Sequence, residues 1–180
     1  HTSRLKSIYG FTQDTTWAHV GKLDNPLLTK QFSDETANTL KNAGINLNFA
    51  PVLDLDYGNG NVISDQQRAC SDDPEKVIEH AKIFIKAHRE NKVITCGKHF
   101  PGLGSASGDT HEGITDITNS WTVKDLQPFD KLIQDNELDT VMVSHAFDKK
   151  LDPNYASSLS PNIISKMLRD DLGFEGVVIC

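Results

Sequence analysis

Short apolar runs alternate along most of this chain with longer stretches in which apolar side chains recur every three or four residues. A short run bounded by turn residues is typical of a buried strand, and the longer period is typical of a helix with one buried face. Alternation of the two predicts successive βα units and a parallel sheet. The expected strands are 45–53, 93–96, 140–144 and 177–180, and the expected helices are 30–43, 123–136, 161–170 and one that begins at 73–75.

Local signals indicate where two of these helices begin or end. Ser33 or Asp34 lies near the expected start of the first helix, and Gly44 is expected to end it, because glycine readily adopts the left-handed conformation that follows a helix. The run 73–75, Asp-Pro-Glu, favours a helix start, since proline fits the first turn and acidic side chains interact favourably with the positive end of the helix dipole. The side chains expected to face inward are Val77, Ile78, Ala81, Phe84, Ile85 and His88 on this helix, and Leu126, Phe129, Leu132 and Ile133 on the next.

Composition and charge exclude several classes of partner. The chain has 37% hydrophobic and 24% charged residues, as in an ordinary globular protein, and its net charge of -7 argues against nucleic acid or an anionic membrane as a partner. No apolar run approaches the roughly 20 residues that a membrane-spanning helix needs. Cys70, Cys96 and Cys180 are widely spaced and form no Cys-x-x-Cys pair, so free thiols are expected rather than disulfides or structural zinc.

The densest group of chemically capable residues is the run 98–104, Lys-His-Phe-Pro-Gly-Leu-Gly, which is followed by Asp109-Thr110-His111. If Asp109 accepts a hydrogen bond from one imidazole nitrogen of His111, it fixes the tautomer and raises the basicity of the ring, and His111 can then act as an acid or a base. Alternatively, Asp109 and Thr110 form a turn with the local backbone and His111 is solvated. These residues taken alone favour the turn.

The motif Lys-His-Phe-Pro-Gly-x-Gly, followed at this distance by Asp-Thr-His, resembles the signature of family 3 glycoside hydrolases, and more narrowly of their β-N-acetylglucosaminidase branch. Leu103 departs from the common form of the motif, which has histidine there, and Ala69 and Cys70 depart from a second motif. Further segments that resemble the family's motifs, in the same order, are 49–54, 68–74, 141–145, 158–160 and 172–179. The resemblance therefore covers nearly the whole chain.

The resemblance implies an α/β fold that is part of a (β/α)8 TIM-type barrel, incomplete at both ends, with residues 1–180 as a single segment of the catalytic barrel. Such barrels carry their active sites at the carboxyl ends of the strands. By matching positions, Asp109 and His111 would be the acid/base dyad. The residues expected to bind substrate are Arg4, Arg68, Lys98, His99 and His145.

Some of these positions also have plainer interpretations. His145 could line the pocket, or it could be a buried histidine bonded to a backbone carbonyl. Asp54 could bond a sugar hydroxyl, but a structural role after its strand is favoured. Trp17 and Trp121 could stack on sugar rings, although packing in the core or at its rim is favoured.

The implied reaction is retaining hydrolysis of a terminal, non-reducing β-linked N-acetylglucosamine. In the family the nucleophilic aspartate directly follows the strand that 176–180 resembles, so it is expected just beyond Cys180, and the 180 residues alone are expected to be inactive. No cofactor is implied. No metal is expected either, because His80 and His88 lack the spacing of a zinc-binding helix.

Two alternatives remain open at this stage. The first is a phosphorylase acting on the same glycosides, because a histidine acid/base tolerates an anionic co-substrate. The second is a non-catalytic sugar-binding remnant. The carbohydrate is the only partner implied, and it could be a peptidoglycan fragment, a chitooligosaccharide or another hexosaminide. The sequence leaves the oligomeric state open, and it leaves the compartment open with a slight preference for the cytoplasm over a periplasmic or secreted location.

Overall fold

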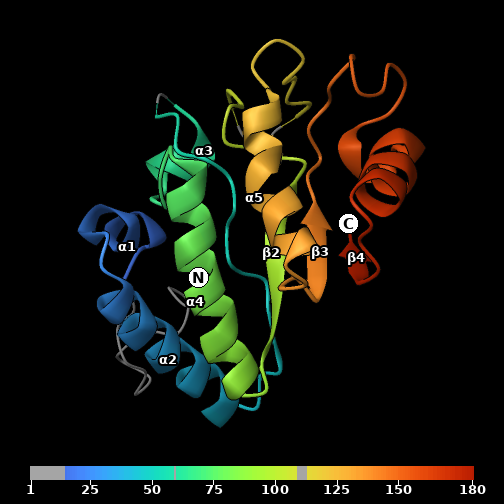
Figure 1. Ribbon diagram of the computed structural model, residues 1–180. Coiled ribbons are helices and arrows are strands. Elements are labelled where there is room, and N and C mark those ends of the chain that lie inside the picture. The colour runs from blue at the N-terminus through green and yellow to red at the C-terminus, as the bar shows by residue number, and fades with distance from the viewer. Residues whose placement is uncertain (1–14, 59, 109–112) are drawn as a thin grey trace.

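The computed structural model describes residues 15–58, 60–108 and 113–180, and within them the chain forms a parallel sheet with helices packed against it (Figure 1). Four strands pair in the order β1-β2-β3-β4, and every pair is parallel. The strands are β1 (Leu47–Asn48), β2 (Ile94–Phe100), β3 (Thr140–Val143) and β4 (Val177–Ile179). This is the expected succession of βα units.

Helices connect the strands and cover the sheet. Both α4 and α5 contact β2, and α2 packs on the side of α4. The helices are α1 (Trp17–Leu23), α2 (Pro26–Asn42), α3 (Val62–Asp65), α4 (Pro74–Glu90) and α5 (Val123–Gln134), followed by the short 3-10 turn η2 (Ser157–Leu159) and the π-helical η3 (Asn162–Asp171).

The start predicted for the first long helix is wrong, because α2 begins at Pro26 rather than at residue 30. Asn25 caps it: its side-chain oxygen accepts hydrogen bonds from the backbone N–H groups of Leu27 and Leu28 at 3.0 and 3.3 Å. Ser33 lies inside the helix, where its hydroxyl donates to the Thr29 carbonyl at 2.7 Å. A serine bonded back along its own helix gives the same sequence signal as a cap, and here the signal misleads.

Two predicted strands differ from the structure by several residues, and the other two, now β3 and β4, each end one residue earlier than predicted. Only Leu47–Asn48 of the expected 45–53 is regular strand, because the Ala50 amide donates back to the Asn48 carbonyl at 2.8 Å and Pro51 has no N–H to continue a regular ladder. Contact with β2 nevertheless persists, since the Leu53 amide donates to the Lys98 carbonyl at 2.7 Å. β2 in turn runs to Phe100, four residues past the predicted end, so Lys98 and His99 belong to the strand itself.

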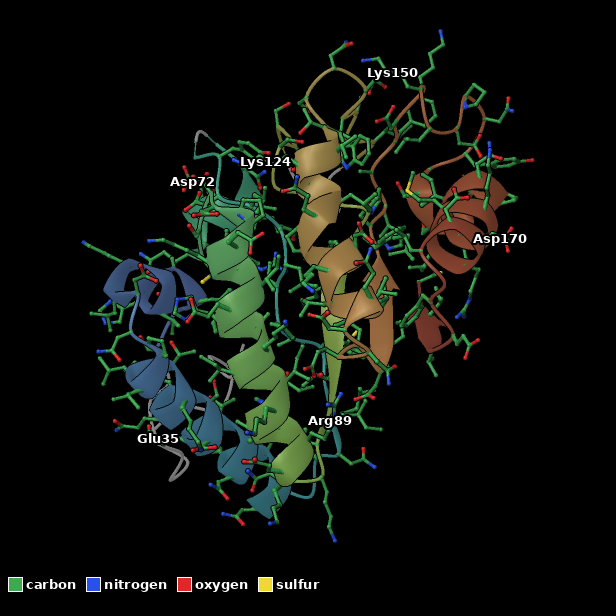
Figure 2. All side chains as sticks on the ribbon, viewed as in Figure 1. Glu35, Asp72, Arg89, Lys124, Lys150 and Asp170 are labelled. Atoms are coloured by element: carbon green, nitrogen blue, oxygen red, sulfur yellow. The ribbon has the colours of Figure 1, made fainter. Side chains whose placement is uncertain are left out.

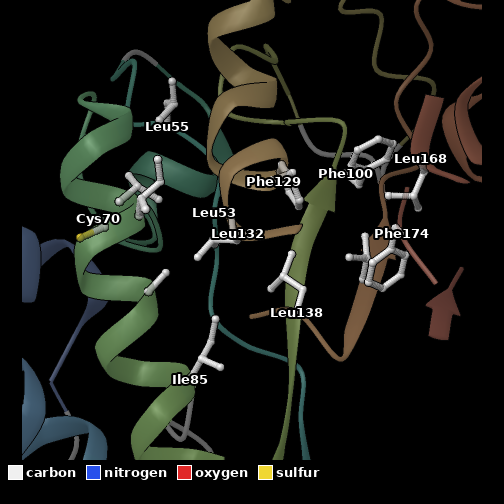
Figure 3. Packing of buried hydrophobic residues seen from close by; sticks show 14 of the residues in the cluster. Leu53, Leu55, Cys70, Ile85, Phe100, Phe129, Leu132, Leu138, Leu168 and Phe174 are labelled. Atoms are coloured by element: carbon white, nitrogen blue, oxygen red, sulfur yellow. The ribbon is translucent and has the colours of Figure 1, made fainter. Parts of the chain in front are cut away.

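The core lies between the sheet and the helices, and it contains the side chains expected there (Figure 3). All six inward positions predicted on α4 are buried. On α5, Phe129 and Leu132 are buried, and Leu126 and Ile133 are partly buried and pack against the same cluster. The Phe100 and Phe129 rings meet edge to face with centroids 5.4 Å apart, which fixes the end of β2 against α5.

Charged side chains cover the outside of the molecule, as the six labelled residues illustrate (Figure 2). One of them, Arg89, forms an ion pair with Glu137 at 3.2 Å and donates to the carbonyl of the same residue at 2.9 Å. Cys70 and Cys96 are buried free thiols, and Cys180 is an exposed one. None of the helices in the described ranges is long and apolar enough to cross a membrane.

Candidate active site

Polar side chains from three neighbouring segments meet at the carboxyl ends of the strands. Asp54 follows the segment after β1, Lys98 and His99 lie near the end of β2, and Ser144 and His145 follow β3. Because the strands are parallel, these ends share one edge of the sheet. The structure thus places Asp54, Lys98 and His99 next to one another, with Ser144 and His145 at the same edge of the sheet.

Asp54, His99 and Arg68 form a continuous hydrogen-bonded chain. The Asp54 carboxylate is completely buried, and its Oδ2 lies 2.6 Å from Nδ1 of His99. On the other side of the ring, Nη2 of Arg68 lies 3.3 Å from Nε2 of His99. An arginine with a predicted binding role and a histidine with the same predicted role are therefore in direct contact.

The other oxygen of Asp54 accepts two backbone hydrogen bonds, from the amide of His99 at 3.2 Å and from the amide of Leu103 at 2.7 Å. Burial raises the pKa of the Asp54 carboxyl, but the charge and hydrogen bond of His99 and the two amides outweigh burial, so the net shift is downward. Asp54 is therefore an ionised acceptor inside the fold. The structural role favoured from the sequence agrees with this burial.

Lys98 and Arg68 both line a cavity of about 100 Å3 beside this chain of hydrogen bonds. Burial, and then the neighbouring charge of Arg68, lower the pKa of the Lys98 ammonium. The remaining lining is mainly apolar and comes from Thr15, Trp17, Val20, Phe32, Ser33, Thr36, Phe84 and the segment 49–52. The cavity thus combines two cationic donors with an apolar wall, which suits a ligand with oxygen acceptors and an apolar face.

The loop that follows β2 is anchored on several sides along residues 101–108, before the chain reaches 109–112, which lie outside the described residues. The indole N–H of Trp121 donates to the Pro101 carbonyl at 3.1 Å, and the side-chain amide of Asn61 donates to the carbonyls of Leu103 and Gly104. A side chain on Gly104 would meet the Leu55 carbonyl oxygen at 2.0 Å. We call residues 101–108 the loop stem.

The sequence left two environments open for His145, the wall of the pocket and a buried position bonded to a backbone carbonyl, and the structure shows neither. Its side chain is exposed rather than buried, and Nδ1 lies 2.7 Å from the hydroxyl of Ser158 rather than from a backbone carbonyl. It is absent from the cavity lined by Arg68 and Lys98. Its predicted contact with substrate therefore depends on a ligand that extends beyond that cavity.

The remaining predicted site residues, Arg4, Asp109 and His111, lie outside the described residues. Trp17 and Trp121 both donate their indole N–H to backbone carbonyls, and Trp17 also packs edge-on against Phe84. Both therefore pack at the core, as favoured from the sequence, although Trp17 also lines the cavity.

Histidines on α4 have structural partners. His80 contacts the Thr29 hydroxyl at 2.8 Å and the Asp24 carboxylate at 3.2 Å, and His88 contacts the Phe84 carbonyl at 2.9 Å. Across the described ranges, no group of three or more histidine, cysteine or acidic side chains is arranged to hold a metal ion.

Comparison with known proteins connects this geometry to a family. Residues 5–180 match the N-terminal domain of glycosyl hydrolase family 3. The chain belongs to this family. A relative, the β-hexosaminidase of Tolumonas auensis, is 40% identical over 137 residues, which are 74% of this chain and 40% of that protein.

Two solved structures show the same fold. The β-N-acetylhexosaminidase of Beutenbergia cavernae superposes with a TM-score of 0.87 at 33% identity, over 94% of this chain and 52% of that one. NagZ of Neisseria gonorrhoeae, solved with N-trifluoroacetyl-D-glucosamine, gives a TM-score of 0.85 at 30% identity and the same coverage. The chain thus spans about half the length, or less, of the family 3 relatives it matches, and its four strands are part of a (β/α)8 barrel.

Sequence reasoning missed Asn61 and underestimated Asp54. Asn61 is buried and holds the loop stem, but its contacts are 42 and 43 residues away along the chain, and no local pattern marks it. Asp54 carried a signal, since it ends a family 3 strand motif and precedes a loop. What the motif did not indicate is that both of its oxygens point into the protein.

Proposed function

We propose that the protein carrying this chain is a retaining β-N-acetylhexosaminidase that removes terminal, non-reducing β-linked N-acetylglucosamine. The observation that supports this most directly is the convergence of Arg68, Lys98 and His99 at one strand end, with Arg68 and Lys98 on a shared cavity. Relatives that carry the β-hexosaminidase name, and a structural neighbour solved with an N-acylated glucosamine derivative, support the substrate class.

In this proposal the described residues bind the sugar. The Lys98 ammonium and the Arg68 guanidinium donate hydrogen bonds to hydroxyl or carbonyl oxygens, since both groups are donors only. His99 supplies a third polar contact at the same strand end. Arg4 and His145 are proposed to add contacts at the edges of the site.

The reaction itself needs two further groups. His111, supported by Asp109, would protonate the leaving oxygen and then remove a proton from water, while an aspartate beyond Cys180 attacks the anomeric carbon. The nucleophile forms a covalent glycosyl-enzyme intermediate, which water then hydrolyses with net retention. Hydrolysis of such glycosides is the class of activity that the named relatives share.

The test is a substitution in the protein that carries this chain. His111→Ala should lower kcat/KM for N,N'-diacetylchitobiose by about 10²- to 10⁴-fold, because general acid catalysis of a poor leaving group is lost. The loss should be much smaller for an aryl N-acetylglucosaminide whose leaving group needs no proton. His19→Ala, an exposed histidine on α1, is the matched control and should leave both activities unchanged.

Near-normal cleavage of the disaccharide by His111→Ala would refute the acid/base assignment. The configuration of the first sugar product, followed by NMR, should be β, and an α product would refute the retaining mechanism. Assays with and without inorganic phosphate separate hydrolysis from phosphorolysis, and a requirement for phosphate would replace the proposed hydrolase with a phosphorylase.

A further inference from the structure

Asp54 is the one group at this strand end, among the residues described, that the proposed reaction does not use although it is ionised and buried there. None of its side chain is exposed, whereas 14% of the His99 side chain is. A sugar can therefore reach His99 but cannot reach Asp54. Any influence of Asp54 on substrate must pass through the groups that it holds.

The hydrogen-bond directions around His99 follow from the chemistry of its two partners. A carboxylate can only accept, so Nδ1 of His99 carries a hydrogen and donates it to Asp54 across 2.6 Å. A guanidinium can only donate, so Nε2 of His99 must be the acceptor for Arg68 across 3.3 Å. Together these contacts specify the neutral tautomer with hydrogen on Nδ1 and a lone pair on Nε2.

The same carboxylate also fixes the backbone on both sides of Pro101. One oxygen accepts the amide of His99 at the end of β2 and the amide of Leu103 in the loop stem. The ring of His99 and the stem of the loop that leads to Asp109 and His111 are thus tied to a single buried point. Displacing that point would move the sugar contact and the start of the loop together.

We propose that Asp54 is a positioning residue: it holds His99 as the Nδ1–H tautomer, so that the Nε2 lone pair, which accepts from Arg68 in this structure, is offered to a sugar hydroxyl that takes the place of the Arg68 donor. Asp54 also anchors the loop stem through Leu103. The inference rests on the proposed function, since it requires a sugar at His99. It goes beyond that function because it assigns the direction of the His99 contact and a role to a residue that touches no substrate.

Asp54→Asn separates this role from simple packing. The two backbone amides still require an acceptor, so the carbonyl oxygen of the new side chain stays with them and its NH2 group faces Nδ1 of His99. The ring must then accept at Nδ1 and carry its hydrogen on Nε2, where it points at the Arg68 guanidinium. Replacing a buried aspartate by asparagine beside a histidine inverts the tautomer in the same way in serine proteases.

The first measurement needs no catalysis. Long-range ¹H–¹⁵N NMR of histidine-labelled protein reports which ring nitrogen carries hydrogen, and His99→Gln assigns the signal. His99 should show hydrogen on Nδ1 at neutral pH in the wild-type protein and on Nε2 in Asp54→Asn. A wild-type His99 with hydrogen on Nε2 alone, or on both nitrogens, would overturn the proposal even if the enzyme proves to be a hexosaminidase.

The second measurement uses the aryl N-acetylglucosaminide. Asp54→Asn should lower kcat/KM by about 10²-fold, because the sugar contact is misplaced, with KM raised as well as kcat lowered. Asp56→Asn makes the same change two residues away, where the carboxylate accepts a hydrogen bond from the Gly58 amide at 3.0 Å, and should have no effect. In a His99→Gln background, Asp54→Asn should cost clearly less than it does alone.

The outcomes distinguish the two proposals. If the wild-type protein does not hydrolyse the substrate but His99 shows the Nδ1–H tautomer, the proposed function fails and the positioning of His99 stands. If Asp54→Asn lowers the melting temperature but leaves KM, kcat and the tautomer unchanged, Asp54 is purely structural and this inference is wrong.

Discussion

At the scale of single residues, the site combines a buried carboxylate, Asp54, with two cations that lie close to each other, Lys98 and Arg68. Asp54 is satisfied by three donors, whereas Lys98 is disfavoured as a cation both by burial and by the charge of Arg68, which lower its pKa. A side chain whose charge is disfavoured by its surroundings reduces the stability of the fold. Such an arrangement is typical of a residue kept for binding rather than for stability.

Replacing Lys98 should therefore separate stability from function. Lys98→Met keeps the length of the side chain and removes the charge, so the free energy of unfolding should rise by about 1 kcal/mol. kcat/KM should fall by about 10- to 100-fold, because one charged hydrogen bond to substrate is lost. Urea unfolding and steady-state kinetics measure the two effects, and Lys124→Met, an exposed lysine on α5, should change neither.

The stability gain should depend on pH in a defined direction. With its pKa lowered in the fold from 10.5, Lys98 binds fewer protons folded than unfolded in the interval below 10.5, so wild-type stability rises with pH there. The advantage of Lys98→Met should shrink over the same interval. An advantage that grows with pH would contradict the assigned cause.

At the scale of elements, the signals that predicted structure correctly are local ones. α4 was predicted from Asp73, Pro74 and the spacing of its apolar side chains, and Asp73 does cap the helix. The end of β2 depended instead on pairing with distant chain, since Phe100 accepts a hydrogen bond from the Ser144 amide. Long-range partners of this kind leave no trace in a window of ten or fifteen residues.

The site residues likewise divide into those that a local motif indicates and those that depend on contacts between distant segments. Two short motifs, 68–74 and 98–104, indicated Arg68 and the pair Lys98 and His99, because the residues within each motif are near one another in sequence. The structure places these three residues together. The partner of His145 was not predictable, because Ser158 comes from the turn η2, thirteen residues further along. The loop stem depends on Asn61, whose contacts are likewise distant.

Gly104 is the position in the loop stem where a single methyl group should matter most. An added Cβ would lie 2.0 Å from the Leu55 carbonyl oxygen and 2.9 Å from the Leu55 nitrogen, so the stem must shift away from the segment after β1. We expect Gly104→Ala to cost about 1–3 kcal/mol in the free energy of unfolding, the range typical of overpacking. It should also lower kcat by at least tenfold, as a small misplacement near the chemistry does.

Gly113→Ala is the matched control, because a Cβ there meets nothing within 4 Å and the substitution lies in the same loop. Chemical denaturation and steady-state kinetics on both variants make the comparison. Equal effects from the two substitutions would show that the stem is not held against Leu55 in the way described.

At the scale of the whole molecule, four parallel strands carry the site at one end and leave apolar side chains exposed along the sheet. Phe49 beside β1 and Val177 in β4 are 47% and 60% exposed. In the sheet as described, β1 and β4 each pair on one side only. A complete (β/α)8 barrel closes on eight parallel strands, so each strand has a neighbour on both sides. The chain spans about half the length of the solved relatives, which is consistent with a sheet of four strands.

Two buried carboxylates should give the folded molecule opposite responses to acid. The pKa of Asp54 is lowered, since its interaction with His99 and its bonds to two backbone amides outweigh burial, whereas burial raises the pKa of Asp125 in spite of its hydrogen bonds from Thr122. The charged form of Asp54 therefore stabilises the fold above its ordinary pKa of 3.8, and the charged form of Asp125 destabilises it.

Urea unfolding at a series of pH values should show that substituting Asp54 lowers the free energy of unfolding and that substituting Asp125 raises it. Asp54→Asn should cost about 3 kcal/mol at neutral pH, because a buried carboxylate that accepts three hydrogen bonds is replaced by a neutral amide, and the cost should diminish as the pH falls below 3.8 through the lowered pKa of the wild-type carboxyl. Asp125→Asn should instead stabilise at neutral pH, and that gain should vanish once the wild-type carboxyl is protonated. A cost for Asp54→Asn that stays constant with pH would mean that the wild-type carboxyl does not change its protonation in the fold, and the ionised anchor of His99 would have to be abandoned.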